Sequence, residues 1–229
     1  MTIKDNLKEA GYDYPELRVT GYEPVIGKSP SQSKFGGKAF ADEDHPPPKY
    51  PLMLQLHVDT LPDEAKKVLN LDTGYIQLFY DRDLGSYEHD GEGQLCRYFV
   101  PRSEHVSHDV VISEGYKEKF IIDWKPFADY RAWEDAEFWD ILYPDELETI
   151  VESEEDLAYP QVMDKLLGAP AFVQGPEYSK CKICGTQKRH IFNIESECNV
   201  DFMFGDSGSG QLQQCPNCVT EFSFGWACH

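Results

Sequence analysis

The chain has 229 residues, and its 41 aspartate and glutamate side chains against 21 lysine and arginine side chains give a formal net charge of −20. This length fits one large domain or two small ones, and a hydrophobic content of 41% excludes a largely disordered chain. The charge repels nucleic-acid phosphates and anionic lipids, so direct binding to nucleic acid or membranes is not expected. It favours basic partners, or simply solubility.

No apolar stretch approaches the roughly 20 residues of a membrane span. The first residues, MTIKDNLKEAGYDYP, lack the apolar core of a signal peptide. We therefore expect a cytoplasmic protein, in which seven cysteines indicate metal binding more than disulfide bonds.

Runs of β-forming residues predict a chain made mainly of strands. A short helix over 2–10 is expected first, with Thr2 as N-cap and Gly11 as stop. Further helices are expected over 60–69 and 160–167. The expected strands are 51–59, 74–80, 95–100, 119–123, 189–195, 201–204, 211–214 and 222–228.

The segment 129–156 concentrates the negative charge. It holds 12 acidic groups and one basic group, Arg131, a net of −11. Apolar and aromatic residues interleave with these charges, and Leu147, Ile150 and Val151 have the spacing of an amphipathic helix. We expect an ordered segment with one buried face and one strongly acidic face. A plain solvated surface is the alternative.

Three pairs of similar segments indicate an internal repeat at offsets of 131, 138 and 136 residues. They are 34–40 with 165–172, 51–58 with 189–196, and 74–80 with 210–216. The pattern predicts two related β-rich halves, approximately 12–125 and 126–229, that share one core. Chance similarity between common strand patterns is the alternative.

The strongest chemical signal is a pair of Cys-x-x-Cys motifs, Cys181-Lys-Ile-Cys184 and Cys215-Pro-Asn-Cys218. Each motif can place two sulfurs on one side of a tight turn, and together they supply the four thiolates, about 2.3 Å from the metal, that structural Zn²⁺ prefers. We predict a zinc module over approximately 178–229, with iron as the other metal that suits four thiolates. A redox pair is disfavoured because a second motif is present and no thioredoxin-like pattern surrounds the first.

The remaining cysteines are not expected to bind metal. Alternation along 222–228 places Phe222, Phe224, Trp226 and Cys228 on one face, so Cys228 reads as a core residue. Cys96 reads in the same way, within its own strand. No role is assigned to Cys198 or to the terminal His229.

Catalytic motifs are weak. Gly205-Asp-Ser-Gly-Ser-Gly210 superficially resembles a protease motif, but Ser209 stands where a nucleophile elbow needs glycine, and a turn explains the segment better. A second candidate is a metal cluster of His89, His105 and His108 with Asp83, Glu88, Asp90 and Asp109, for which a solvated loop is favoured. No catalytic residue is assigned, and whether the chain is an enzyme stays open.

Several motifs resemble the bacterial YwqG-like family of unknown function. They are Ser33-Lys-Phe-Gly-Gly37, Pro51-Leu-Met-Leu-Gln-Leu56, Gly74-Tyr-Ile-Gln-Leu-Phe-Tyr80, Lys165-Leu-Leu-Gly-Ala-Pro170, Val173-Gln-Gly175 and Phe204-Gly-Asp-Ser-Gly208. That family is itself similar to the programmed-cell-death-protein-2 group, thought to act as chaperones of a ribosomal protein. The resemblance implies a duplicated β-rich domain used for protein binding, and it supplies no catalytic residue.

We expect an α+β fold that is mostly β, a single domain over 1–229 with two packed halves and outer helices. The expected function is a protein-interaction or chaperone-like module that binds a basic polypeptide, such as a ribosomal protein or a nuclease toxin. An enzyme acting on a small ligand in a cleft between the halves is the alternative. A structural component of a larger complex is a third possibility.

Overall fold

The computed structural model describes residues 17–101, 115–141 and 160–229. Its strands form one antiparallel sheet of ten. In sheet order they are β10 (Phe222–Ala227), β9 (Ser209–Gln214), β8 (Arg189–Glu195), β7 (Lys165–Leu167), β1 (Arg18–Gly27), β6 (Lys119–Tyr130), β2 (Lys34–Phe35), β3 (Leu52–His57), β4 (Tyr75–Tyr80) and β5 (Gln94–Phe99).

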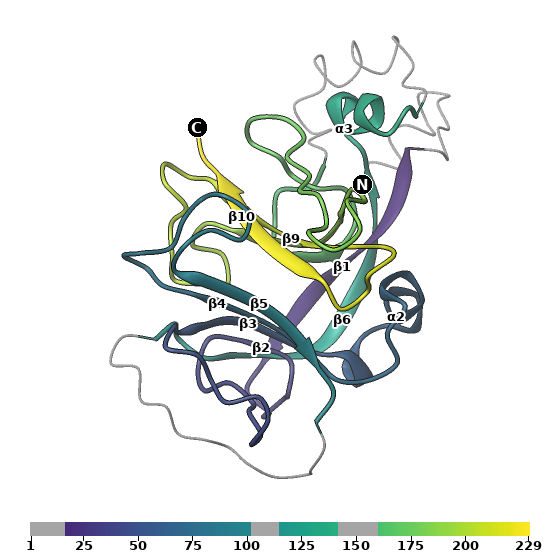
Figure 1. Ribbon diagram of the computed structural model, residues 1–229. Coiled ribbons are helices and arrows are strands. Elements are labelled where there is room, and N and C mark those ends of the chain that lie inside the picture. The colour runs from purple at the N-terminus through teal and green to yellow at the C-terminus, as the bar shows by residue number, and fades with distance from the viewer. Residues whose placement is uncertain (1–16, 102–114, 142–159) are drawn as a thin grey trace.

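The sheet curls until its two edge strands, β10 and β5, lie against each other (Figure 1). The loop between β4 and β5 packs on the outer edge of β10, where the backbone N–H of Trp226 donates to the carbonyl oxygen of Tyr87 at 2.9 Å. The Trp226 indole also donates to the hydroxyl of Tyr80 at 2.6 Å. The expectation of a mostly β fold is confirmed.

Helices are few and short among the described residues: η1 (Val58–Thr60), α2 (Asp63–Leu69) and α3 (Trp133–Phe138). The helix expected over 60–69 is present, but it begins later because Pro62 lies at its N-cap in an extended conformation. Asn70 ends it in a left-handed conformation with φ of 52°. The face of α2 that carries Ala65 and Leu69 is buried against the sheet.

The prediction of a helix over 160–167 is wrong, because Lys165–Leu167 form the strand β7. This strand pairs with both β1 and β8, and its side chains are buried on both sides. Tertiary pairing therefore overrides a weak local helix preference. The segment 201–204 is also not a strand, although Phe204 is fully buried.

Two further differences concern the centre of the sheet. The sequence did not predict β1, whose Gly21 and Pro24 interrupt a pattern of β-forming residues. It predicted only the beginning of β6, which continues to Tyr130. The expected helix over 2–10, the histidines His105 and His108 with Asp109, and the helical spacing at Leu147, Ile150 and Val151 lie outside the described residues.

The same succession of pairings occurs on both sides of the central strands. β2, β3, β4 and β5 follow β6 on one side, and β7, β8, β9 and β10 follow β1 on the other. The pairing register shifts at matching places, between Leu52 and Leu54 in β3 and between His190 and Phe192 in β8. Gene duplication as the origin of this correspondence stays a prediction.

Both halves contribute to one hydrophobic core. Phe192 of β8 contacts Phe35 of β2 and Trp124 of β6, with ring centroids 6.0 and 6.3 Å apart. Tyr80 of β4 makes edge contacts with Phe204 and with Phe224 of β10. Such aromatic contacts stabilise a core beyond the burial of their area.

A buried ion pair joins β6 to β7 beside this core. The Nζ of Lys165 lies 2.6 Å from Oδ2 of Asp129, and both side chains are fully buried. The carboxylate also accepts hydrogen bonds from the backbone N–H groups of Tyr130, Gln161 and Ala169, each at 3.0 Å. The charge of Asp129 is therefore fully coordinated by the protein.

Replacing Lys165 with methionine should leave the Asp129 charge buried without its counter-ion, and should lower the free energy of unfolding by about 3–5 kcal/mol. Urea unfolding monitored by tryptophan fluorescence measures this. The matched control is Lys125→Met, which removes a largely exposed pair with Glu23 and should cost less than about 1 kcal/mol. Equal losses in the two variants would contradict the assigned role of the buried pair.

Candidate metal centre and ligand pocket

The first cysteine knuckle is a tight turn between the chain after Tyr178 and the start of β8. The backbone N–H of Gly185 donates to the carbonyl oxygen of Cys181 at 2.8 Å, and the N–H of Cys181 donates to Thr186 at 2.9 Å. Gly185 has a φ of 73°, with open space where a Cβ would stand. The left-handed backbone, not crowding, therefore favours glycine at this position.

The second knuckle follows β9 directly. The backbone N–H of Cys218 lies 3.2 Å from the sulfur of Cys215, and the N–H of Glu221 donates to the carbonyl oxygen of Cys218 at 2.8 Å. The Cys215 N–H in turn donates to Glu221, which leads into β10. The turn thus aims both sulfurs toward the first knuckle.

The two knuckles bring four sulfurs together. The Sγ atoms of Cys181, Cys184, Cys215 and Cys218 all lie within 4.8 Å of one another. Cys184 and Cys215 are 3.5 Å apart, far beyond a disulfide bond, and all four thiols are free. Tetrahedral thiolates at the usual Zn–S length lie about 3.8 Å from one another, so this donor set can hold a metal ion.

The thiols differ in acidity. Hydrogen bonds from Thr186 lower the pKa of Cys184 to about 6, so a thiolate forms readily there. Its hydrogen bond with Cys184 raises the pKa of Cys218 to about 12, and burial raises that of Cys215. A bound dication would favour the thiolate form of all of them.

The other predicted residues lie apart from this cluster. Cys96 packs against the core, where burial raises its pKa, and Cys228 is half-buried against Gly205. Cys198 is exposed. Gly205–Ser207 form a turn as expected, and Ser209 donates its hydroxyl to the carbonyl oxygen of Ala171.

The loop before β5 holds the described part of the second candidate metal cluster. Asp90 faces the amino group of Lys182 at 3.2 Å, and His89 packs on Gly225 with a weak contact to Gln213 at 3.4 Å. Within 17–101, 115–141 and 160–229, the four cysteines are the one group found with metal-binding geometry.

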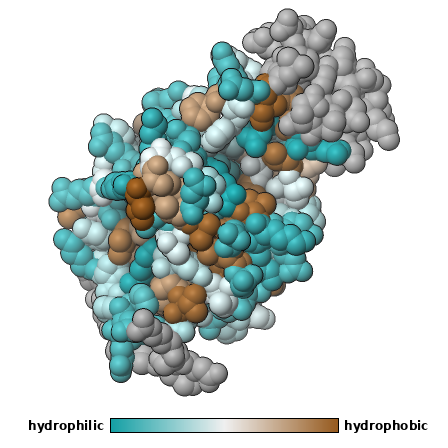
Figure 2. Space-filling model, turned by 45° about the vertical axis from the view of Figure 1, so that its right-hand side comes forward, coloured by the Kyte–Doolittle hydropathy of each residue, from teal (hydrophilic) through white to brown (hydrophobic). Residues whose placement is uncertain are grey.

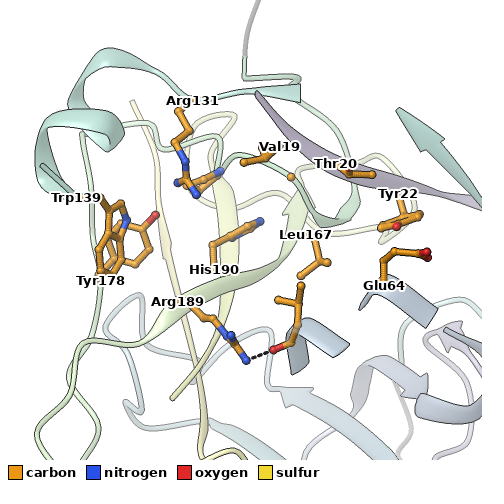
Figure 3. Close-up of a pocket in the computed structure, with 13 residues that line it drawn as sticks. Val19, Thr20, Tyr22, Glu64, Arg131, Trp139, Leu167, Tyr178, Arg189 and His190 are labelled. Carbon is orange, nitrogen blue, oxygen red and sulfur yellow. Dashed lines mark hydrogen bonds between the residues drawn. The ribbon is translucent and has the colours of Figure 1, made fainter. Parts of the chain in front are cut away.

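A pocket of about 420 Å³ lies where the two halves meet (Figure 3). β1 and α2 form one side, and residues from the second half form the other. The lining residues are Val19, Thr20, Tyr22, Glu64, Val68, Arg131, Trp139, Leu167, Gly168, Pro170, Tyr178, Arg189 and His190. Most of these surfaces are apolar, and pockets of this size take small organic molecules.

Two arginines and one histidine line the pocket: Arg131, Arg189 and His190. His190 is only 8% exposed, and neither ring nitrogen makes a hydrogen bond with the described residues, although the Leu167 backbone and the Gln211 side chain lie near it. Burial and the positive charge of Lys165 lower the pKa of His190 to about 3, so the imidazole is neutral at neutral pH. In Figure 3, His190 and Arg131 point into the same space.

The comparisons with known proteins bear on both sites. A family of domains of unknown function, DUF1963, matches residues 33–212. The chain belongs to this family. No curated protein matches it. The match begins at Ser33, in the first of the motifs noted in the sequence, so membership in a family of unknown function is confirmed. The narrower YwqG-like assignment stays a prediction.

The matched DUF1963 region includes the first knuckle and most of the pocket, and it ends in β9 before the second knuckle. Among the residues that the structure describes, no helix is long and apolar enough to cross a membrane. The four metal-ligand candidates were found from spacing alone. The pocket of this DUF1963 domain was not, because its walls come from distant segments, and the one signal was a histidine directly before Ile191 and Phe192 in a predicted strand.

His190 makes stability depend on pH. The folded imidazole protonates only near pH 3, whereas an unfolded histidine protonates near 6.5. The unfolded state therefore binds the proton first as the pH falls below 6.5, and stability decreases from there toward pH 3. Between pH 7 and 4.5 the wild type should lose on the order of 2 kcal/mol more than His190→Phe, measured by urea unfolding.

The control is His229→Phe at the exposed C-terminal position, which should keep the wild-type pH profile. Parallel profiles for wild type and His190→Phe would show that His190 is not held neutral by the fold.

Proposed function

We propose that this DUF1963 domain is a cytoplasmic, zinc-stabilised module that binds a basic polypeptide. Four thiolates close the coordination sphere, so Zn²⁺ at this site has a structural role and no open position for a catalytic water. The two knuckles flank β8 and β9, which pair with each other. A bound ion therefore links the start of β8 to the end of β9.

Replacing Cys181 or Cys215 with serine should abolish stoichiometric zinc and unfold the C-terminal quarter. Structural zinc contributes on the order of 10–16 kcal/mol in small peptides, as much as the whole stability of a typical domain. Elemental analysis for zinc and iron, together with thermal unfolding, measures both effects. Cys198→Ser, at an exposed cysteine outside the cluster, is the control and should behave as wild type. Wild-type melting of the knuckle variants would exclude a metal that the fold needs.

The observation that carries the polypeptide-binding proposal is the surface of α3. Trp133, Phe138 and Trp139 are 46, 42 and 36% exposed, which is unusual for three large aromatic side chains so close in sequence. Exposed acidic groups, Glu137 and Asp140, lie among them. We call these five residues the α3 surface. Acidic groups speed encounter with a cationic segment, and aromatic rings then hold it through burial and cation–π contacts.

The α3 surface is held in place by Tyr178 and Arg131. Asp135 is only 1% exposed and accepts hydrogen bonds from the hydroxyl of Tyr178 and the guanidinium of Arg131, both at 2.5 Å. The Tyr178 ring also packs on Phe138 and Trp139, with centroids 4.9 and 5.1 Å apart. A pre-organised surface loses less conformational entropy when it binds.

The third possibility, a purely structural component, would favour one large apolar patch. On the face in Figure 2, the hydrophobic side chains of the described residues gather in small clusters between hydrophilic ones. This arrangement suits a partner with mixed charge and aromatic contacts better than a broad apolar interface.

A fluorescent peptide that alternates lysine or arginine with leucine should bind the full chain at low salt and more weakly at high salt, measured by fluorescence anisotropy. Trp133→Ala should weaken binding about tenfold, the usual loss at an aromatic anchor. Leu84→Ala is the control, because Leu84 is 59% exposed and lies outside the α3 surface. Equal binding of an acidic peptide, or full binding by Trp133→Ala, would count against the proposal.

The second candidate is an enzyme that acts on a small ligand in a cleft between the halves. The pocket favours it because β1 and α2 belong to the first half, whereas Arg131, Tyr178 and His190 belong to the second. A substrate there would contact both halves at once.

A further inference from the structure

The pocket between the halves holds a cation, Arg189, that has no acidic partner among the described residues. The guanidinium of Arg189 donates to the carbonyl oxygen of Val68 and to Oε1 of Gln214, both uncharged groups. Its Nε is buried without a hydrogen bond, and no carboxylate lies within 4.0 Å of it in the described part of the chain. Burial lowers the pKa of Arg189, and Cys215 opposes this effect.

The other charges of the pocket nearly balance. Arg131 is paired with Asp135 at 2.5 Å, and among the described residues Glu64 of α2 is the one acidic side chain in the lining. Arg131 also points toward His190 in Figure 3. The pocket is therefore more positive than the rest of a chain with net charge −20.

His190 adds hydrogen-bonding capacity that the described residues leave unused. A neutral imidazole carries one N–H donor and one acceptor nitrogen, and leaving both buried and unpaired costs free energy. The single N–H can donate either to Oε1 of Gln211, which is unpaired nearby, or to the anionic group of a ligand, because His190 forms part of the pocket wall.

The walls favour a flat apolar body. Tyr22, Trp139 and Tyr178 supply aromatic rings, and Val68 and Leu167 supply aliphatic surface. Aromatic side chains contact a planar ligand through a large area at low entropic cost. A volume of about 420 Å³ accommodates two fused rings with one substituent.

We propose that this pocket binds a small organic anion with a planar, apolar body, such as an aromatic carboxylate or phosphate ester. The anionic group accepts hydrogen bonds from His190 and from arginine N–H groups, and the planar body packs on the aromatic and aliphatic walls. This inference does not rest on the polypeptide proposal, although Trp139 belongs both to the α3 surface and to the pocket wall. It names the class of ligand for the second candidate function. It claims only that the ligand binds, and makes no claim that the ligand is converted.

The test is isothermal titration calorimetry of the full chain with 2-naphthoate, 2-naphthyl phosphate, uncharged 2-naphthamide and inorganic phosphate. One of the two anions should bind at a single site, and the preferred one identifies the ligand as a carboxylate or a phosphate ester. The amide and inorganic phosphate should bind at least about tenfold more weakly, since each lacks one half of the recognised chemistry.

Two variants locate the site. Val68→Trp fills the pocket from a helix position that is 40% exposed, and His190→Phe removes the ring nitrogens. Each should weaken binding of the preferred anion at least about tenfold. Leu84→Trp, on an exposed site that does not line the pocket, is the control and should bind as wild type.

The basic peptide should bind the two pocket variants as it binds wild type, which separates failure of this inference from failure of the polypeptide proposal and from unfolding. The inference is overturned if neither naphthyl anion binds, if the amide binds as well as the anions, or if a folded Val68→Trp variant binds the preferred anion normally.

Discussion

The long ladder between β1 and β6 is the interaction on which the architecture depends. It joins the two sides of the sheet, because β1 also pairs with β7, which leads to β8, β9 and β10, and β6 also pairs with β2, which leads to β3, β4 and β5. The buried Lys165–Asp129 pair secures this arrangement, since β7 carries the lysine and β6 carries the aspartate. Side chains of β1, α2 and the segments after β6 form the pocket walls, so the pocket depends on the packing of these elements.

The metal centre and the pocket share a structural element. β8 carries Arg189 and His190 in the pocket wall and lies between the two knuckles in the chain. Arg189 also bonds to Gln214, the neighbour of Cys215. Whatever fixes the positions of the cysteines therefore also fixes one wall of the pocket. The α3 surface is linked to the same region through Tyr178, which contacts α3 and lines the pocket.

The sequence predicted the features that depend on local pattern. The strands β3, β4, β8, β9 and β10 follow β-forming runs, and the cysteine spacing is enough to bring four sulfurs together. Features set by distant contacts were missed or mistaken. The sequence of β7 has a weak helix preference, which its pairing with β1 and β8 overrides. Gly21 and Pro24 interrupt the pattern of β-forming residues in β1. The pocket could not be predicted, because the sequence does not show whether a buried histidine has hydrogen-bond partners. These partners come from residues that are distant in the chain.

The contact between β5 and β10 has a consequence for the behaviour of the protein in a crowded solution. An open strand edge offers unpaired backbone groups to other chains and is a common start of aggregation. Here the two edge strands of the sheet lie against each other, and the carbonyl oxygen of Tyr87 accepts a hydrogen bond from the outward N–H of Trp226 in β10. The fold therefore protects itself against edge-to-edge polymerisation by geometry, and it can expose aromatic side chains on α3 without also offering a strand to which other chains could add.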